Sequence, residues 1–268
     1  MYYISRVHYL RKLFFAFLFL SAFGYSSFSD SSPEFVNITE STITKNINQQ
    51  TITVIFRSDS GILWIGTQHG LYRYDGVTLT TYNSEEGGRE WIPSSDIRAI
   101  TQDSDGLLLV GTYGAGLLRW NSSLSLFENF PIDEELRSES ITYILSSENG
   151  YLWIGSNSGI SVFDQKLARD TSWLNSSALA REIGKIEQIV ELPSGDIIAA
   201  TASALYRISI SENRIRQILP TTFHAESIEK IASIEIDKVG NTLYVGKTNG
   251  DILSFNLSDM SLSARTTV

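Results

Sequence analysis

The stretch "GILWIGTQHGLYRYDG", residues Gly61 to Gly76, recurs four more times along the chain in altered form. The other copies are "DGLLLVGTYGAGLLRWN" (105–121), "NGYLWIGSNSGISVFD" (149–164), "SGDIIAATASALYRIS" (194–209) and "VGNTLYVGKTNGDILSFN" (239–256). The first glycines of the copies are 45, 44, 45 and 45 residues apart, at Gly61, Gly106, Gly150, Gly195 and Gly240. A period of about 40 to 50 residues in a strand-rich sequence is typical of β-propeller blades, each of which is a four-stranded antiparallel sheet.

Each copy and its flanks contain short runs in which apolar and polar residues alternate, as half-buried strands require. Around the first copy the predicted strands, from the innermost outward, are "TITVIF" (51–56), "ILWIGT" (62–67), "LYRYD" (71–75) and "VTLTTY" (77–82). The later innermost strands begin at Ile97, Ile141, Ile186 and Ile231. The turns between first and second strands end in a glycine that can take a positive φ, at Gly61, Gly106, Gly150, Gly195 and Gly240. The sequence therefore predicts an all-β fold with about five propeller blades, near residues 51–82, 97–130, 141–174, 186–219 and 231–268.

The bulky and the small residues of the repeat have a structural interpretation. Trp64 and Trp153 occupy one place in their copies, which suits a wedge packed between neighbouring blades. Leu109, Ile198 and a Leu or Tyr at 243 to 244 replace them in the other copies. At the position two residues after each of these bulky residues, only a small side chain would let adjacent sheets approach. The small residues there are Gly66, Gly111, Gly155, Ala200 and Gly246.

Composition excludes several classes of function. The chain has 268 residues and a formal net charge of −9, which opposes binding to a nucleic acid or to an anionic membrane surface. Cysteine is absent, which excludes disulfides, thiolate metal sites and cysteine nucleophiles. The sequence thus indicates an acidic globular protein without a nucleic-acid partner.

The N-terminus has the charge order of a secretory signal. Basic residues precede the apolar run from Leu13 to Phe23, and small residues follow at Ser27 and Ser29. We expect residues 1–29 to be a signal peptide and residues 30–268 to form the propeller in the periplasm. An uncleaved anchor is the alternative, although the run is shorter than the roughly 20 residues that span a bilayer. No further membrane span is expected.

The first and third copies resemble the two-component regulator propeller repeat, which is found in the periplasmic sensor regions of bacterial hybrid histidine kinases and of some diguanylate cyclases. The characteristic places of the repeat hold Trp64, Gly66, Thr67, Gly70, Leu71, Arg73, Asp75 and Gly76 in the first copy, and Trp153, Gly155, Gly159 and Asp164 in the third. The resemblance covers residues 35 to 256. The fourth and fifth copies depart from the pattern, at Ala199 and Ala200 and by one extra residue within 239–246.

This resemblance implies a secreted, non-catalytic module that senses a ligand, usually two complete propellers followed by a small all-β domain, a transmembrane helix and an output domain. The residues after Phe255 suffice for one outer strand, and the chain has no kinase or cyclase signature. We therefore expect the chain to be the N-terminal fragment of a longer or split sensor. Its expected partners are the missing blades of a larger, seven-bladed propeller and an output domain. The alternatives are five blades that close into a small ring, or assembly with another chain.

The expected ligand site lies on the side of the propeller where blades are connected, because loops on a rigid scaffold carry most binding functions. The long connections are Asn83–Asp96, Pro131–Ser140, Asn175–Lys185 and Pro220–Lys230. The residues to test are Trp91, His69, Tyr113 and Asn157. The alternative is that Trp91 packs under its own loop and that the other three are ordinary turn residues. A saccharide or similar small molecule as the ligand is implied only by the resemblance.

No catalytic, metal or cofactor site is predicted. His8 lies in the signal, and His69 and His224 lack the spacing of metal ligands. "DSDG" at 103–106 is similar to the start of a calcium loop, but Leu107 and Leu109 stand where oxygen ligands are needed, so a turn is expected. The acidic run at 133–135 is interpreted as a solvated loop rather than an acid–base pair.

Two other functional classes remain open. One is a propeller enzyme similar to streptogramin lyases or quinone-dependent dehydrogenases. A His–Glu pair across the channel or an adjacent Cys pair would support it, but no such pair is found. The other is a structural propeller that binds only a protein partner.

Overall fold

The structure is a computed structural model, and it describes residues 47, 51–85, 90–103, 105–130, 139–164, 183–218 and 230–267. The chain divides into Met1–Ser41 and Thr42–Val268, and every described residue lies in the second part. The predicted signal peptide, its cleavage site, His8, His224 and the acidic run at 133–135 lie outside the described residues.

The described residues form strands and turns, without a helix. The first sheet contains β1 (Ile52–Arg57), β2 (Leu63–Thr67), β3 (Leu71–Tyr74) and β4 (Leu79–Tyr82). The second contains β5 (Ile97–Gln102), β6 (Leu108–Thr112), β7 (Leu117–Asn121) and β8 (Leu126–Asn129). The third contains β9 (Ile141–Ser146), β10 (Leu152–Ser156) and β11 (Gly159–Phe163). The fourth contains β12 (Gln188–Glu191), β13 (Ile197–Ala200), β14 (Leu205–Ser209) and β15 (Arg214–Gln217). The fifth contains β16 (Ile231–Asp237), β17 (Thr242–Lys247), β18 (Asp251–Asn256) and β19 (Leu262–Thr267).

Every sheet is an antiparallel meander in which consecutive strands pair. Four sheets have four strands, and the third has three before residues 165–182, which lie outside the described part. The predicted all-β fold of four-stranded antiparallel sheets is therefore confirmed. The second and third innermost strands begin at Ile97 and Ile141, as the sequence indicated, and that of the fourth sheet begins two residues later than predicted, at Gln188.

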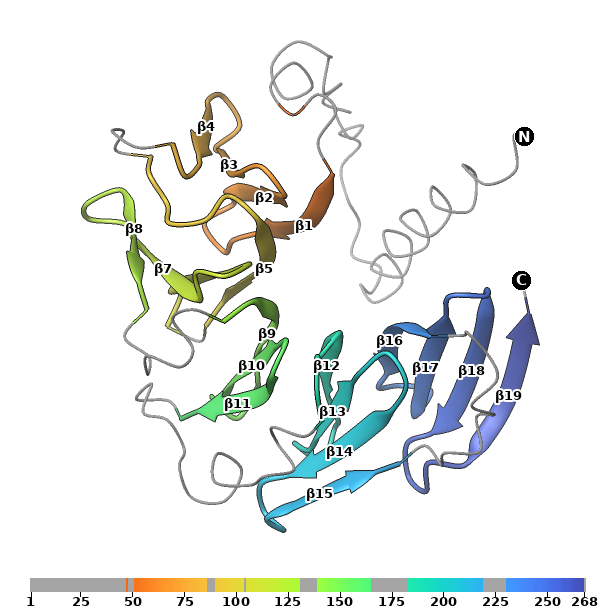
Figure 1. Cartoon of the computed structure of the whole chain (residues 1–268). Coiled ribbons are helices and arrows are strands. Elements are labelled where there is room, and N and C mark those ends of the chain that lie inside the picture. The colour runs from red at the N-terminus through yellow and green to blue at the C-terminus, as the bar shows by residue number, and fades with distance from the viewer. Residues whose placement is uncertain are drawn as a thin grey trace, which may run out of the picture. The chain divides into compact units, whose positions relative to one another are not determined.

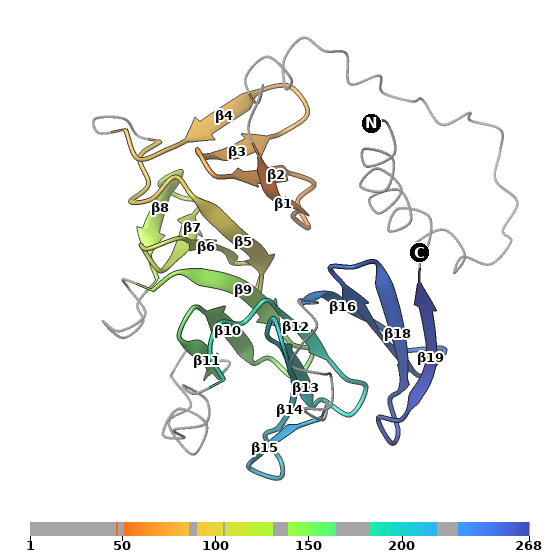
Figure 2. The same ribbon diagram turned by 45° about the vertical axis from the view of Figure 1, so that its right-hand side comes forward.

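The sheets follow one another in chain order, and the first strand of each contacts the first strand of the next: β1 with β5, β5 with β9, β9 with β12 and β12 with β16. Figures 1 and 2 both show these strands on the inner side of the sheets, with β4, β8, β15 and β19 on the outer side. The buried side chains gather between neighbouring sheets rather than within one sheet. The core is thus a series of inter-sheet layers.

The predicted wedge and the predicted close approach are both found between sheets. Trp64 packs with Ile100 and Val110 of the second sheet, and Trp153 packs with Ile189 and Ala199 of the fourth. A Cβ placed on Gly66 would lie 2.7 Å from Cγ2 of Ile97, the first residue of the next sheet. The same contact recurs at Gly111 with Ile141, at 2.6 Å, and at Gly155 with Ile186, at 2.7 Å.

The turn between the first and second strands needs a left-handed residue, which glycine supplies in four copies and asparagine in the fifth. The φ angles of Gly61, Gly106, Gly150 and Gly195 lie between 81° and 84°. In the fifth copy Asn241 takes this conformation, with φ 50°, and not Gly240. The expectation that Gly240 is the turn glycine is therefore wrong, because the extra residue of this copy shifts the turn by one position.

The fifth sheet offers a test at acidic pH. The carboxylate of Asp251 is buried and accepts hydrogen bonds from Thr267 Oγ1 at 2.7 Å, Asn249 Nδ2 at 3.1 Å and Arg265 Nη2. These bonds, led by those from Thr267 and Asn249, lower the pKa of Asp251. Since the folded pKa lies below the unfolded value of about 3.9, the stabilisation is present above that value and is lost as the pH falls through the folded pKa.

We expect Asp251→Asn to lower the melting temperature at pH 7, because Asn binds Arg265 less well. The difference from the unmodified chain should shrink as the pH falls below about 4. Thermal unfolding followed by circular dichroism at several pH values measures both effects. A difference that stays constant across this range would contradict the role of the carboxylate.

Candidate functional site

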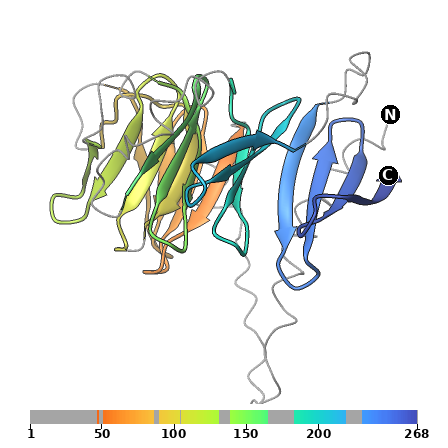
Figure 3. The ribbon, with the colours of Figure 1, turned by 90° about the horizontal axis from the view of Figure 1, so that it is seen from below.

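One side of the propeller brings together the turns between second and third strands and the residues that lead into the first strands. The backbone N–H of Tyr113 donates to Asp96 O at 2.8 Å, that of Asn157 to Ser140 O at 3.2 Å, and that of Thr248 to Lys230 O at 2.9 Å. Figure 3 shows the strands of the sheets running between two opposite sides. Since consecutive strands are antiparallel, the turns after second strands and the starts of first strands lie on the same side, which holds all three hydrogen bonds. This side is called the connection side below.

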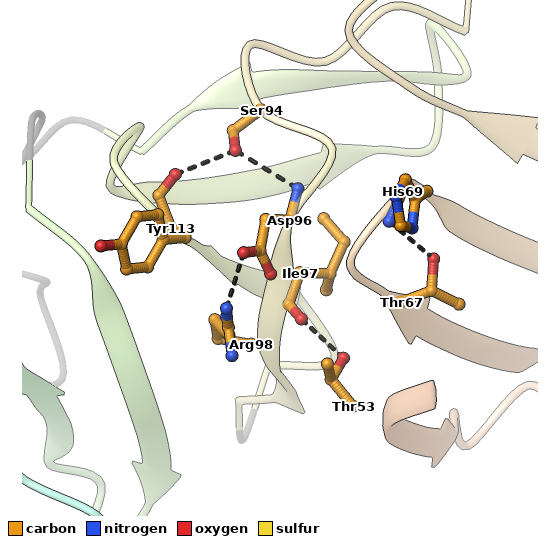
Figure 4. A network of polar contacts seen from close by, with 8 residues as sticks. All are labelled: Thr53, Thr67, His69, Ser94, Asp96, Ile97, Arg98 and Tyr113. Atoms are coloured by element: carbon orange, nitrogen blue, oxygen red, sulfur yellow. Dashed lines mark hydrogen bonds and ion pairs between the residues drawn. The ribbon is translucent and has the colours of Figure 1, made fainter. Parts of the chain in front are cut away.

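The second sheet carries a group of polar residues on the connection side, formed by Ser94, Asp96, Arg98 and Tyr113 and named the connection cluster here. Ser94 Oγ donates to Tyr113 O at 2.9 Å, and Arg98 Nη2 donates to Asp96 Oδ2 at 2.6 Å. The guanidinium carbon of Arg98 lies 5.4 Å from the ring centroid of Tyr113, within the range of a cation–π interaction. Figure 4 shows Tyr113 and Arg98 beside Asp96, with His69 and Thr67 on its other side.

A β-bulge explains why Arg98 points into this cluster. The register of β5 against β6 shifts between Ile97 and Ala99, so Arg98 is the extra residue of the strand. A bulge redirects the side chain of its extra residue, and bulges are common beside functional sites. Ile97 can then pack on Gly66 while its two polar neighbours, Asp96 and Arg98, remain on the connection side.

The same bulge occurs in the first and fifth sheets, between Ile52 and Val54 and between Ile231 and Ser233. In the fourth sheet, Lys185 and Glu187 flank Ile186 as Asp96 and Arg98 flank Ile97, and Lys185 Nζ lies 2.9 Å from Glu187 Oε1. An ion pair across the first isoleucine therefore occurs in two sheets, with the order of the charges reversed.

The connection cluster retains unused hydrogen-bonding capacity. The side chains of Arg98 and Asp96 are 34% and 26% exposed, yet Asp96 Oδ1 and Arg98 Nε are buried and have no hydrogen-bond partner among the described residues. Buried polar atoms without a partner are rare, because each costs about 1 to 3 kcal/mol. Since both atoms are inaccessible, a bound molecule would reach this pair through its exposed part, which offers guanidinium N–H donors and carboxylate acceptors.

The four residues proposed from the sequence are distributed as follows. Tyr113 belongs to the connection cluster, and its side chain is 53% exposed. His69 is exposed on the neighbouring turn of the first sheet, where its backbone N–H donates to Thr67 Oγ1 at 3.0 Å. Trp91 is 45% exposed and forms an isolated bridge with Asn83. Asn157 lies on the corresponding turn of the third sheet. The structure thus brings Tyr113 into a polar cluster with three residues that the sequence analysis did not propose.

Asp103 has a structural role in the segment that is similar to a calcium loop. Its Oδ1 accepts the backbone N–H groups of Asp105 at 3.0 Å and Leu107 at 2.8 Å, and its O accepts that of Gly106 at 3.0 Å. The carboxylate therefore closes the turn between β5 and β6. Within the described ranges, no group of three or more His, Asp or Glu residues is placed to hold a metal ion.

The described residues also contain no helix with the length and apolar character needed to cross a membrane.

Comparison with family models identifies residues 92–114 as a match to the family described as two component regulator propeller. The matched segment runs from the connection through β5 and β6, and it contains the whole connection cluster. It overlaps the second copy, whereas the characteristic places of the repeat are best preserved in the first and third copies. No curated protein matches the chain.

Solved structures share the fold at low sequence identity. The extracellular domain of BT4673 from B. thetaiotaomicron, assigned as a hybrid two component system, is 18% identical with a TM-score of 0.64 over 80% of this chain and 27% of that one. The extracellular domain of BT3049 from the same organism is 20% identical, with a TM-score of 0.65 over 79% of this chain and 29% of that one. Virginiamycin B lyase from Staphylococcus aureus is 14% identical with a TM-score of 0.60 over 83% and 72%.

The chain spans less than a third of the length of the two extracellular domains. Because extracellular domains of two component systems and a lyase share this architecture, the fold by itself does not assign an activity. The match to the family model and the resemblance seen in the sequence both point to the same repeat. The chain is therefore a β-propeller that carries a two-component regulator propeller repeat.

Proposed function

We propose that the chain is a non-catalytic sensing module of a two-component or cyclic-di-GMP signalling system, exported to the periplasm, where it binds a saccharide or a similar polyhydroxylated molecule on the connection side. The observation that carries the proposal is the connection cluster, in which an exposed Tyr113 ring lies beside the partly exposed Arg98–Asp96 ion pair. The match to the regulator propeller repeat and the extracellular domains of two component systems with a similar fold support the signalling role.

A saccharide combines the two kinds of surface that this cluster offers. Its ring carries apolar C–H groups, which pack on the face of an aromatic side chain, and hydroxyl groups, which need paired donors and acceptors. Arg98 lies over the Tyr113 ring, and Tyr113 is still 53% exposed. The guanidinium and carboxylate then offer a donor and an acceptor close to that ring.

The proposal that the module is non-catalytic rests on the chemistry of the same residues. Asp96 is the one carboxylate of the connection cluster, and one of its oxygens is engaged in the ion pair with Arg98. The cluster contains no imidazole or second carboxylate with which Asp96 would form an acid–base pair.

We expect Tyr113→Ala to weaken binding of the best ligand from a panel of neutral and acidic oligosaccharides about tenfold, or about 1.4 kcal/mol. Tyr113→Phe keeps the ring and should retain most of the affinity, whereas Asp96→Asn should weaken binding by a similar factor to Tyr113→Ala. Isothermal titration calorimetry measures the affinities, and a thermal-shift screen selects the ligand. Leu124→Ala, at an exposed position in the turn between β7 and β8, is the matched control.

Equal affinities of the unmodified chain, Tyr113→Ala and Asp96→Asn for the selected ligand would place binding elsewhere and contradict the proposed site. A panel without any ligand that raises the melting temperature would contradict the proposed ligand class.

A further inference from the structure

The fourth sheet carries a second ion pair on the connection side, formed by Lys185 and Glu187 and named the second pair here. Lys185 Nζ lies 2.9 Å from Glu187 Oε1 and 3.0 Å from Glu187 Oε2. Ile186, which separates the two residues, is completely buried against Gly155 of the third sheet. The packing of this isoleucine leaves its two charged neighbours on the connection side, as it does in the connection cluster.

The second pair is more accessible than the pair of the connection cluster. The side chains of Lys185 and Glu187 are 52% and 35% exposed, compared with 34% and 26% for Arg98 and Asp96. Exposed ion pairs contribute only about 0.2 to 1 kcal/mol to stability, because water solvates and screens their charges. Folding therefore gives little reason for the second pair, and its donor and its acceptor both remain within reach of a bound molecule.

The third sheet links the two ion pairs through further polar groups. Ser158 Oγ donates to Glu139 Oε1 at 2.7 Å on the connection side, and Asn157 beside them is exposed. A backbone hydrogen bond of 3.1 Å joins Glu139 to the turn of the second sheet at Gly116, and one of 3.0 Å joins the turn of the third sheet to Ile186. The connection cluster, these polar residues and the second pair thus form one continuous strip across three sheets, named the connection band here.

The first and fifth sheets do not repeat this arrangement. The positions before and after the first isoleucine hold Thr51 and Thr53 in the first sheet, and Lys230 and Ala232 in the fifth. The hydroxyl group of Thr53 already donates to Ile97 O at 2.6 Å. Among the described residues, an ion pair across the first isoleucine is therefore confined to the second and fourth sheets.

We propose, on the basis of the function proposed above, that the second pair is a further subsite for the ligand of the connection cluster, and that this ligand is a neutral oligosaccharide bound across three sheets. One end of the oligosaccharide packs on Tyr113. Lys185 donates to hydroxyl groups of the sugar units further along the chain, and Glu187 accepts hydrogen bonds from them.

The connection band determines the length and the charge of this ligand. Neighbouring sheets pack about 10 Å apart, so about 15 to 20 Å separate the two ion pairs. A monosaccharide cannot reach both pairs, whereas a chain of several sugar units can. The band contains two cations, Arg98 and Lys185, and each is already paired with a carboxylate. A uronate or sulfate group would therefore find no free positive charge in the band, and the carboxylate of Glu139 would repel it.

Calorimetry of the whole chain with a length series of one oligosaccharide tests the proposal. The series runs from the disaccharide to the hexasaccharide of the neutral compound that most raises the melting temperature. We expect the hexasaccharide to bind about tenfold more tightly than the disaccharide. Lys185→Ala and Glu187→Gln should each weaken hexasaccharide binding about tenfold and leave disaccharide binding unchanged. Tyr113→Ala should weaken the binding of both compounds.

Lys238→Ala is the matched control. Lys238 is also 52% exposed and paired with a glutamate, Glu148, but it lies between β16 and β17, on the side opposite the connection side. Its replacement should change neither affinity. The uronic acid counterpart of the hexasaccharide should bind no more tightly than the neutral compound, and circular dichroism verifies that each variant folds.

The outcomes separate this proposal from the proposed function. Equal affinities for the disaccharide and the hexasaccharide would overturn the second subsite and leave the site at Tyr113 intact, as would unchanged hexasaccharide binding by Lys185→Ala and Glu187→Gln. Tighter binding of the uronic acid counterpart would overturn the neutral ligand class. A panel in which no oligosaccharide binds, or a Tyr113→Ala variant that binds like the unmodified chain, would overturn the proposed function and the second subsite together.

Discussion

Gly66→Val is expected to prevent compact folding of the chain. A Cβ at this position would lie 2.7 Å from both Ile97 Cγ2 and Val54 Cγ1, and 3.1 Å from Ile97 Cβ. Ile97 and Val54 are β-branched residues in strands, so their side chains cannot move aside without separating the first two sheets. Overpacking typically costs about 1 to 3 kcal/mol, and we expect about 3 kcal/mol or more here because the layer between the sheets has to open. Urea unfolding followed by tryptophan fluorescence measures the loss.

Gly246→Val is the matched control for this prediction, since Gly246 has the same place in the fifth sheet and no described sheet follows it. Its stability should change little. Ile97→Ala removes the methyl group that a Cβ at position 66 would meet, so it should restore part of the stability when combined with Gly66→Val. An unchanged urea midpoint for Gly66→Val would show that the glycine is not needed for the approach of the sheets.

Much of the fold could be predicted because one contact recurs. The wedge and the small residue two positions later are visible in the sequence, and the structure places the first isoleucine of the next sheet above Gly66, Gly111 and Gly155. Gly240 was misassigned because glycine and asparagine both tolerate the left-handed conformation, so composition does not show which residue the turn uses. Tyr244, the wedge of the fifth sheet, has the residue type of a buried position but is exposed. Whether a wedge is buried depends on the neighbouring sheet, and a single copy of the repeat does not show whether that sheet is present.

The candidate site was predicted only in part. Tyr113 is conspicuous as an aromatic residue in a turn between two strands, and the rule that such turns face the connections led to it. Asp96 and Arg98 were missed because they flank an isoleucine that reads as an ordinary strand start. The bulge that places both side chains on the connection side changes the register by one residue, and alternation alone does not show which residue is the extra one. The reversed pair at Lys185 and Glu187 is the feature of the sequence that would have indicated it.

Trp153→Ala is expected to destabilise the chain by about 3 to 5 kcal/mol, the usual range for removing a fully buried aromatic side chain. Trp153 is completely buried between the third and fourth sheets, where it packs with Ile189 and Ala199. Its loss would leave a cavity in the middle of the series of sheets. Thermal and urea unfolding measure the change, and the two halves of the chain should lose cooperativity because this layer connects them.

Two further variants separate the contribution of packing to the stability from those of the indole N–H and of the position between two sheets. Trp153 Nε1 has no hydrogen-bond partner among the described residues, so Trp153→Phe removes an unsatisfied donor and should cost much less than Trp153→Ala. Tyr244→Ala removes the equivalent wedge of the fifth sheet, which is 40% exposed, and should cost about 1 kcal/mol or less. If Tyr244→Ala and Trp153→Ala lowered the free energy of unfolding equally in dilute solution, burial between two sheets would not be what makes the wedge important. A large difference would show that each wedge stabilises the chain through the sheet that follows it.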